Sequence, residues 1–376
     1  MNMPYIRSEI RYGLEQAEYA KFFRYLALEV DVNPDTILDY CNHPVIRFLL
    51  NDVKSTTYER TCYLEALSYG DPGVMLSCPG PSLSGLMIRE LGTDTQIESF
   101  YNFLQKNSAR TFFALTEPTT GSDANNLQCK LSPIKDRPGQ YYLNGEKCLF
   151  GNGAVGKIGI VLARTHSGPL GIRAVLITPE MLDPNKDWIV RENLPMTGLR
   201  GAQIAYMRFN NCPVNADNLL GEHSRPMQRG MMAVIKTFNR LRTGVGALAI
   251  GQAQAVLDFT YEIKTSWNSA ESKNYCNLYY QIDGVRHLLR DSAKTIDQNP
   301  FDSYSVSLSK VQATKIAEQV ITSCISMLDP TVMLENQWIA KCYRDCFAWE
   351  YMEGTKNMQF FNIFQRYKNS FYEKNE

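Results

Sequence analysis

The sequence predicts an α+β protein in which helical segments flank a central β domain. Apolar residues follow helical spacing through residues 1–107 and again through 223–376, where they predict a four-helix bundle. Between them, in residues 108–222, the period shifts towards two and Gly, Pro and Asn become frequent, which predicts an antiparallel β-barrel or sandwich. Because no helices alternate with these strands, a doubly wound parallel sheet is not expected.

Composition and charge exclude several classes of protein. Lys+Arg and Asp+Glu both number 39, so no net field favours nucleic acid or an anionic membrane. No signal-peptide core is present, and no apolar run approaches the ~18 residues of a membrane span. The ten cysteines form no Cys-x-x-Cys pair and the four histidines are widely spaced, so we expect reduced thiols, no metal site and a cytoplasmic location.

The N-terminal segment reads as a series of helices with clear boundaries. Apolar spacings of three and four residues predict helices over 14–30, 44–53 and 57–69. Asp71-Pro72-Gly73 interrupts the third. The stretch 92–96 combines a helix stop with a new N-cap and starts a helix that runs to Phe103. We expect a mainly scaffolding role for this segment.

The central segment predicts a hairpin and several strands. Asn144-Gly145 lies between alternating residues in 141–147 and favours a tight hairpin turn. Residues 158–163, 172–177 and 204–209 are rich in β-branched and aromatic side chains and read as strands.

A dinucleotide-binding fingerprint in this segment is rejected. Gly151-Asn-Gly-Ala-Val-Gly156 matches G-x-G-x-x-G letter for letter. That motif requires a strand before it and a helix opening at its end. Here a strand-like run begins at Lys157, so we interpret the match as a loop.

The C-terminal segment is predicted to consist of long helices. The first, over 238–261, is rich in Ala and Gly, which permits close helix–helix approach at a cost of up to ~1 kcal/mol per Gly. Further helices are expected over 277–297, 305–327 and 336–349, followed by a short helix through Tyr367.

A turn at 116–123 is a candidate binding element. A strand-like lead-in reaches Glu117-Pro118, and Thr119-Thr-Gly-Ser-Asp123 then turns sharply. Such a turn directs backbone N–H groups and hydroxyls to one side, which makes a neutral cradle for an anion or a polar ring edge. The alternative is a strand end with ordinary turn chemistry.

The run Phe112-Phe-Ala-Leu-Thr-Glu-Pro-Thr-Thr-Gly-Ser-Asp123 resembles the flavin-binding signature of the acyl-CoA dehydrogenase family. The resemblance extends over nearly the whole chain, because further family motifs follow in order. They are Leu143-Asn-Gly-Glu-Lys147, Asn152-Gly153, Leu162-Ala-Arg-Thr165, Gly198-Leu-Arg-Gly-Ala202, Phe209, Asn218-Leu-Leu-Gly221, Arg242, Tyr343-Arg-Asp345 and Glu353-Gly-Thr355. Each motif is unspecific alone, but the ordered set predicts the acyl-CoA dehydrogenase fold.

The resemblance implies a reaction and a base. In such enzymes a carboxylate removes the proton α to a thioester carbonyl while a hydride leaves the β carbon for flavin N5. The matching carboxylate is Glu353, and its backbone N–H would polarise the thioester carbonyl. A lone Glu is usually a solvated helix residue, and only the following Gly354-Thr355 reverses that interpretation. Some members carry the base before the position of Arg242, but here Leu241 occupies it.

The resemblance also implies binding residues for FAD and for the substrate. Ser122 would lie near the pyrophosphate and the substrate, while Thr355 and Asn357 would approach the adenosine half of FAD. Asn239 and Arg242 would border the pantetheine channel. Met352 and Gly354 would flank the bound thioester. The remaining flavin contacts would be Phe113, Leu115, Thr116, Gly121, Leu149 and Gly151.

Several departures from the family pattern suggest a specialised member. Leu149 and Gly151 replace the usual Trp and Thr beside the flavin, and Met352 replaces the usual Tyr. The Arg-x-x-Phe-Gly motif is absent from 264–274, and the glycine-rich adenosine turn is altered at 326–330. These features resemble dehydrogenases of polyketide and nonribosomal peptide biosynthesis that act on carrier-protein thioesters. The nearest fit is aminomalonyl extender-unit formation in colibactin-like pathways.

Two other functions remain open from the residues alone. One is a flavin-free isomerase or hydratase of the same fold, and the other is a non-catalytic subunit that docks a carrier protein. The resemblance further implies a homo-oligomer, either a dimer or a tetramer. The resemblance leaves an electron-transfer flavoprotein and oxygen open as the electron acceptor, and CoA and an acyl carrier protein open as the carrier of the substrate.

Overall fold

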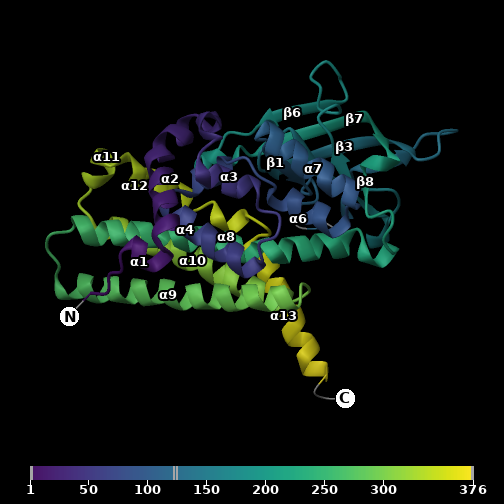
Figure 1. Ribbon diagram of the computed structural model, residues 1–376. Coiled ribbons are helices and arrows are strands. Elements are labelled where there is room, and N and C mark those ends of the chain that lie inside the picture. Colours follow the sequence, from purple (N-terminus) through teal and green to yellow (C-terminus); the bar gives the residue numbers. More distant parts are fainter. Residues whose placement is uncertain (1–2, 122, 124–125, 374–376) are drawn as a thin grey trace.

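The computed structural model describes residues 3–121, 123 and 126–373. Helical elements come first, strands follow, and long helices complete the chain (Figure 1). This confirms the predicted α+β class and the order of its parts, while the exact domain limits at 107 and 222 stay predictions. No helix in the described residues is long and apolar enough to cross a bilayer.

Several N-terminal helices begin at side-chain caps, including the one that the sequence predicts in the stretch 92–96. Thr56 and Thr93 each form a capping box, with Glu59 and Gln96 respectively. Asp71 accepts a hydrogen bond from the N–H of Val74 and starts a new helix where the previous one ends. The helical elements are α1 (Ser8–Tyr12), α2 (Leu14–Val32), η1 (Pro34–Tyr40), α3 (Pro44–Leu50), α4 (Thr57–Gly70), α5 (Pro72–Ser77), α6 (Ser82–Leu91) and α7 (Asp94–Asn107).

In the described residues eight strands form one sheet in the order β6-β7-β3-β2-β4-β5-β8, with β1 paired to β4. Their bounds are β1 (Thr111–Ala114), β2 (Lys130–Pro133), β3 (Gln140–Phe150), β4 (Ile158–Arg164), β5 (Ile172–Ile177), β6 (Ile189–Asn193), β7 (Ala205–Asn215) and β8 (Leu219–Leu220). Most pairs are antiparallel, but β1 and β2 both run parallel to β4. The sheet is therefore mixed rather than antiparallel, because the chain passes through β2 and β3 before β4 returns in the direction of β1.

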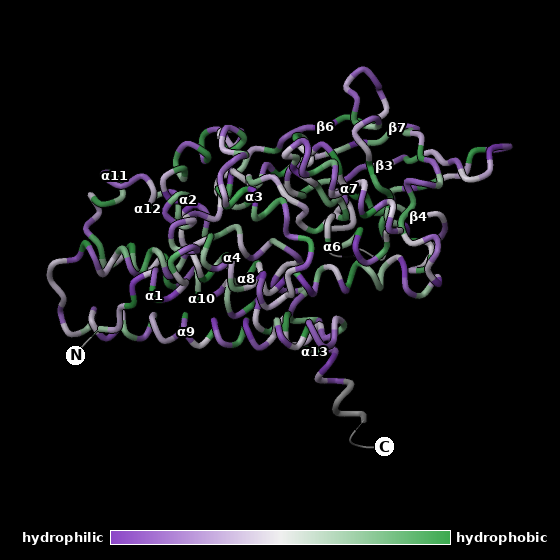
Figure 2. The backbone as a smooth tube through the Cα atoms, in the orientation of Figure 1, coloured by the Kyte–Doolittle hydropathy of each residue, from purple (hydrophilic) through white to green (hydrophobic). Residues whose placement is uncertain are grey.

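Strand β1 connects the sheet to the helices. Phe113 belongs to the core shared with the N-terminal helices, whereas its neighbour Phe112 belongs to the core inside the β domain. This alternation follows from the two faces of a strand. Figure 2 shows hydrophobic stretches within the strands and hydrophilic loops that extend from the sheet.

The predicted hairpin at Asn144-Gly145 is wrong. Strand β3 continues through both residues, and its register against β7 shifts between Leu143 and Gly145, which marks a β-bulge. The Asn144 side chain accepts a hydrogen bond from the N–H of Asn211 on β7 (2.8 Å). Gly145 has φ +134°, and a Cβ there would lie 2.7 Å from the Cα of Cys129. The Asn-Gly pair therefore serves a bulge and a close backbone approach instead of a turn.

Replacing Gly145 by alanine is expected to destabilise the sheet. The added methyl group would force β3 away from the segment that carries Cys129, at a cost of about 1–3 kcal/mol in the free energy of unfolding. Gly168→Ala is the matched control, because Gly168 also has positive φ (+88°) but no neighbour within 4 Å of a Cβ. Urea unfolding measures both variants, and equal losses would contradict the proposed clash.

The sequence 151–156 forms turns between β3 and β4 and no helix follows it, which confirms its interpretation as a loop. Its glycines serve packing. A Cβ on Gly153 would lie 2.3 Å from the ring of Phe150, and one on Gly156 would lie 2.8 Å from the ring of Phe112.

The long C-terminal helices α8, α9 and α10 pack together, α13 packs on α10, and α4 from the N-terminal part lies along α8 (Figure 1). Small residues on α8 permit these contacts, as predicted: a Cβ on Gly251 would lie 2.3 Å from the carbonyl oxygen of Glu65 on α4. The elements are α8 (Met231–Ile263), α9 (Ser269–Gln298), α10 (Ser303–Met327), α11 (Val332–Glu335), α12 (Gln337–Asp345), η7 (Trp349–Tyr351) and α13 (Lys356–Glu373).

Candidate active site

The turn after β1 is organised by a buried ion pair. The Nζ of Lys147 on β3 lies 2.7 Å from the carboxylate of Glu117, and both side chains are almost fully buried. Glu117 also accepts hydrogen bonds from the N–H of Cys129 (2.9 Å) and the hydroxyl of Thr120 (3.0 Å). Lys147 further donates to the carbonyl of Leu115 (2.9 Å). Glu117 is thus committed to shaping the turn, which leaves the surrounding groups to bind a ligand.

The predicted flavin-binding residues lie along this turn and the end of β3. Phe113 is buried in β1, and Leu115 and Thr116 are half-buried at its end. Gly121 is exposed, with its nearest neighbour 3.8 Å from a Cβ position, so the backbone there is open to a ligand. Ser122 lies outside the described residues.

The end of β3 lies beside the turn. The N–H of Cys148 donates to the carbonyl of Thr116 (2.9 Å), which places the following Leu149 next to the turn. Leu149 is 63% exposed and has φ +57°, an unusual combination for a large apolar residue. Gly151 is half-buried near the carbonyl of Ala202. An open backbone and an uncovered apolar side chain fit one face of an aromatic cofactor.

Glu353 occupies a left-handed turn between η7 and α13. Its φ is +53° and that of Gly354 is +98°, and the left-handed conformation costs a non-glycine residue about 1–2 kcal/mol. The Oε2 atom of Glu353 is buried without a hydrogen-bond partner in the described residues. The N–H of Glu353 likewise has no acceptor among them. A strained residue with an unsatisfied carboxylate is typical of a catalytic position.

Three side chains hold the carbonyl groups of this turn. Arg242 on α8 donates from Nε to the carbonyl of Glu353 (3.2 Å), and Gln359 on α13 donates to the carbonyls of Glu353 and Gly354 (both 3.1 Å). Lys310 on α10 donates to the carbonyls of Glu350 (2.7 Å) and Gly354 (2.9 Å). The sequence reasoning missed Lys310 and Gln359.

Burial controls the ionisation of this group of residues. It raises the pKa of Glu353 to about 7, against the opposing charges of Arg242 and Lys310. Burial also lowers the pKa of Arg242 to about 10 and that of Lys310 to about 8, although Glu353 favours the charged form of both. A carboxylate whose pKa lies near neutrality is suited to general base catalysis.

A short chain of contacts connects the base to the flavin-side residues. Phe113 on β1 packs edge-on against Phe238 of α8 (centroids 5.7 Å apart), and the guanidinium of Arg242 lies 6.0 Å from the Phe238 ring centroid. Arg242 in turn holds the Glu353 carbonyl. Phe113, at one end of the predicted flavin site, is therefore connected to Glu353, the predicted base, through only two intervening side chains, those of Phe238 and Arg242.

The other predicted substrate and adenosine residues have different surroundings. Asn239 is fully buried, with its amide bound to Pro300, Ser303 and Arg242, so in this structure it orients Arg242. Met352 is half-buried and packs against the helical core. Thr355 is half-buried and Asn357 exposed at the start of α13. Their predicted contacts with FAD or substrate stay predictions.

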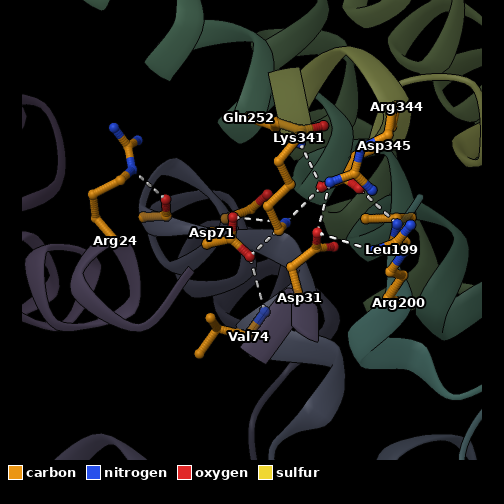
Figure 3. A network of polar contacts seen from close by, with 12 residues as sticks. Arg24, Asp31, Asp71, Val74, Leu199, Arg200, Gln252, Lys341, Arg344 and Asp345 are labelled. Carbon is orange, nitrogen blue, oxygen red and sulfur yellow. Dashed lines mark hydrogen bonds and ion pairs between the residues drawn. The ribbon is translucent and has the colours of Figure 1, made fainter. Parts of the chain in front are cut away.

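A buried polar network connects α12 with the start of α5. Figure 3 shows Lys341 between two carboxylates, those of Asp71 (2.8 Å) and Asp345 (2.6 Å). Asp345 also accepts hydrogen bonds from the N–H of Leu199 (2.6 Å) and from Gln252 (3.2 Å). The network joins the N-terminal helices, the β domain and α12, and it anchors the chain just before the Glu353 turn.

Two family models match the chain. The acyl-CoA dehydrogenase middle domain matches residues 112–212, and the acyl-CoA dehydrogenase C-terminal domain matches residues 228–368, together well over half of the chain. The chain belongs to the acyl-CoA dehydrogenase family.

Individual relatives agree with this family. The short-chain specific acyl-CoA dehydrogenase of Megasphaera elsdenii is 28% identical over 310 residues, which is 79% of this chain and 78% of the relative. The caffeyl-CoA reductase–Etf complex subunit CarC of Acetobacterium woodii is 25% identical over 302 residues, 77% of this chain and 76% of the subunit. Among solved structures, the prolyl acyl carrier protein oxidase AnaB has a TM-score of 0.81 at 18% identity, over 96% of this chain and 99% of AnaB. At that identity AnaB shows the shared fold alone.

Family membership makes this acyl-CoA dehydrogenase an FAD-dependent oxidoreductase that acts on acyl thioesters. It favours the predicted FAD enzyme over the flavin-free alternative. The residues present fit the cofactor, because the turn after β1 is open at Gly121 and Leu149 is uncovered beside it. The replacement of the usual Trp and Thr by Leu149 and Gly151 removes a stacked ring and a hydroxyl but leaves the backbone of this wall in place.

Proposed function

We propose that this dehydrogenase oxidises an acyl thioester held on a carrier protein, with Glu353 as the base. The observation that carries the assignment of the base is the buried, unpartnered Oε2 of Glu353, in a turn whose carbonyls are fixed by Arg242 and Gln359. Because its pKa is raised to about 7, the carboxylate is basic enough to take a proton and is still ionised above neutral pH.

The residues of the chain divide the work of the reaction. The wall formed by Phe113, Leu115, Thr116, Gly121 and Leu149 would hold the flavin ring, and FAD, when bound, supplies the acceptor for the hydride that leaves the substrate. Glu353 would take the proton at its free Oε2. The unpartnered N–H of Glu353 would donate to the thioester carbonyl and stabilise the negative charge that develops there.

The carrier-protein substrate is supported by the kind of departures that this chain carries. Met352 stands before Glu353 where the family usually has Tyr, and AnaB, which shares the fold, is by name a prolyl acyl carrier protein oxidase. We propose a role in polyketide or nonribosomal peptide biosynthesis, such as aminomalonyl-carrier protein formation. In that reaction the hydride leaves C3 of an aldehyde hydrate and Glu353 takes the accompanying proton from its hydroxyl group.

The partners follow from related proteins and from the surface. An electron-transfer flavoprotein is the proposed electron acceptor, because CarC belongs by name to an Etf complex. A cytoplasmic homo-oligomer, dimer or tetramer, is proposed as the working form. Its support is the apolar face of α13, where Phe360, Phe361 and Phe364 are 47%, 53% and 59% exposed. Light scattering of the purified protein measures the oligomeric state.

A comparison of carriers tests the proposed substrate. The purified flavoprotein is mixed without oxygen with two acyl groups, butyryl and 2-amino-3-oxopropanoyl, each presented on CoA and on a carrier protein. We expect the carrier-bound aldehyde to reduce the flavin with a second-order rate constant at least about 10-fold above that of its CoA thioester. This corresponds to a difference of about 1.4 kcal/mol in activation free energy. Equal rates on CoA would overturn the carrier assignment, and faster bleaching by butyryl thioesters would overturn the aldehyde assignment.

A further inference from the structure

Lys310 is a buried cation that the reaction as described does not use. It lies on α10 and is completely buried. No carboxylate in the described part of the chain lies within 4.0 Å of its amine. The amine instead donates to two backbone carbonyls, those of Glu350 (2.7 Å) and Gly354 (2.9 Å). A buried ammonium is costly unless its hydrogen bonds are satisfied, so this arrangement calls for a functional reason.

The two carbonyls lie on either side of Glu353. Glu350 belongs to η7 and Gly354 follows the base, so the amine connects the two ends of the segment that contains it. The carbonyl of Gly354 also accepts a hydrogen bond from Gln359. The carbonyl of Glu350 accepts a side-chain hydrogen bond from Lys310. Because the peptide group is planar, a fixed carbonyl also fixes the N–H of the next residue. Lys310 therefore limits the conformations open to the Glu353 turn from both sides.

We propose that Lys310 is a positioning residue that holds the Glu353 turn in its left-handed conformation and favours the ionised carboxylate. The first part follows from the hydrogen bonds to Glu350 and Gly354. The second follows from charge: the cationic groups that act on Glu353 are Arg242 from α8 and Lys310 from α10. Lys310 itself is acted on by Glu353, Arg242 and Glu350. The inference rests on the proposed role of Glu353 as the base.

The direction of the pH effect follows from these charges. Burial raises the pKa of Glu353, and the two cations oppose that rise. Loss of the Lys310 charge removes one of the two cations that lower this pKa, so the pKa of Glu353 should rise further above about 7. Since the ionised form is the base, activity should then appear only at higher pH.

Lys310→Met tests the proposal in the FAD-loaded enzyme, with Lys315→Met as control because Lys315 is an exposed lysine on the same helix. We expect kcat to fall about 10–100-fold, and the acid limb of the kcat/KM profile to move to higher pH. The apparent dissociation constant for the thioester, read from the flavin spectrum, should change less than about threefold. The probes are butyryl-CoA and butyryl-carrier protein, and the assay uses the one that reduces the wild-type flavin.

A second readout needs no substrate. Hydrogen exchange of the peptide that contains residues 349–355 should become at least about 10-fold faster in Lys310→Met and stay unchanged in Lys315→Met. If Lys310→Met does not fold, Lys310→Gln replaces it, because it keeps a donor but loses the charge. The acid limb should then move in the same direction.

The outcomes separate this inference from the proposed function. Unchanged exchange at 349–355 would overturn the positioning role, whatever the substrate. An acid limb at the wild-type pH would overturn the electrostatic role. If Glu353→Gln is inactive while the Lys310 variants behave as the wild type, this inference fails alone. If Glu353→Gln keeps full activity, the assignment of the base fails and the exchange experiment still decides whether Lys310 holds the turn.

Discussion

Glu353→Gln is expected to lower kcat about 10³-fold, because the amide keeps the shape of the side chain but cannot take a proton. The effect should be large since Oε2 of Glu353 is buried and no other residue in the described chain forms a hydrogen bond with it. Stopped-flow reduction of the bound flavin by the preferred thioester measures the loss. The flavin content and the thioester affinity should stay close to wild type, because neither depends on proton removal.

Glu350→Gln is the matched control for this prediction. It makes the same chemical change three positions earlier, in a residue whose contact with Lys310 uses the backbone carbonyl. We expect its kcat to stay within about threefold of the wild type. A Glu353→Gln enzyme that reduces its flavin at the control rate would show that another group takes the proton, and the assignment of the base would have to be abandoned.

Lys341→Met is expected to lower the free energy of unfolding by about 3–5 kcal/mol. The amine lies between the carboxylates of Asp71 and Asp345, and all three side chains are almost fully buried. Removal of the cation leaves two acidic groups in the interior without compensation. Burial and the nearby Asp345 already raise the pKa of Asp71, against the effect of Lys341. Without the lysine, ionisation of Asp71 becomes still less favourable.

Urea unfolding of Lys341→Met is compared with that of Lys294→Met. Lys294 lies on the surface of α9 and pairs with Asp291 at 3.9 Å, so its replacement should change the free energy of unfolding by less than about 0.5 kcal/mol. Similar small losses in both variants would mean that the network in Figure 3 adds little net stability.

The fold could be predicted because its signals are local, whereas Glu353 was found through the family resemblance and its role as the base stays a proposal. The strands β4 and β5 are mostly apolar, with Arg173 as the exception within β5, and the Glu-Gly-Thr motif at Glu353 lies in a turn with a positive-φ glycine after Glu353. The hairpin predicted at Asn144-Gly145 was wrong because it too rested on a local signal alone. The local preference of this pair for positive φ suits a hairpin and a bulge alike, and only the distant partners Cys129 and Asn211 decide between them.

The role of Lys310 could not be predicted from its local sequence. This lysine shares one face of α10 with Val306, Ala313 and Ala317, all buried, so a charge in an apolar stripe was visible in the sequence. Its purpose was not visible, because the carbonyls that it binds lie about 40 residues later and face it only after α10 and the Glu353 turn have packed.

The long sequence separation inside the Lys341 network has a consequence for synthesis of the chain. Asp71 and Lys341 are 270 positions apart. At about 5–20 residues per second, a ribosome needs roughly 15–50 s to add the lysine after it has added the aspartate. During that interval the emerging helices α4 and α5 lack the cation that neutralises Asp71. The nascent chain should therefore remain open to protease at these helices until α12 leaves the exit tunnel.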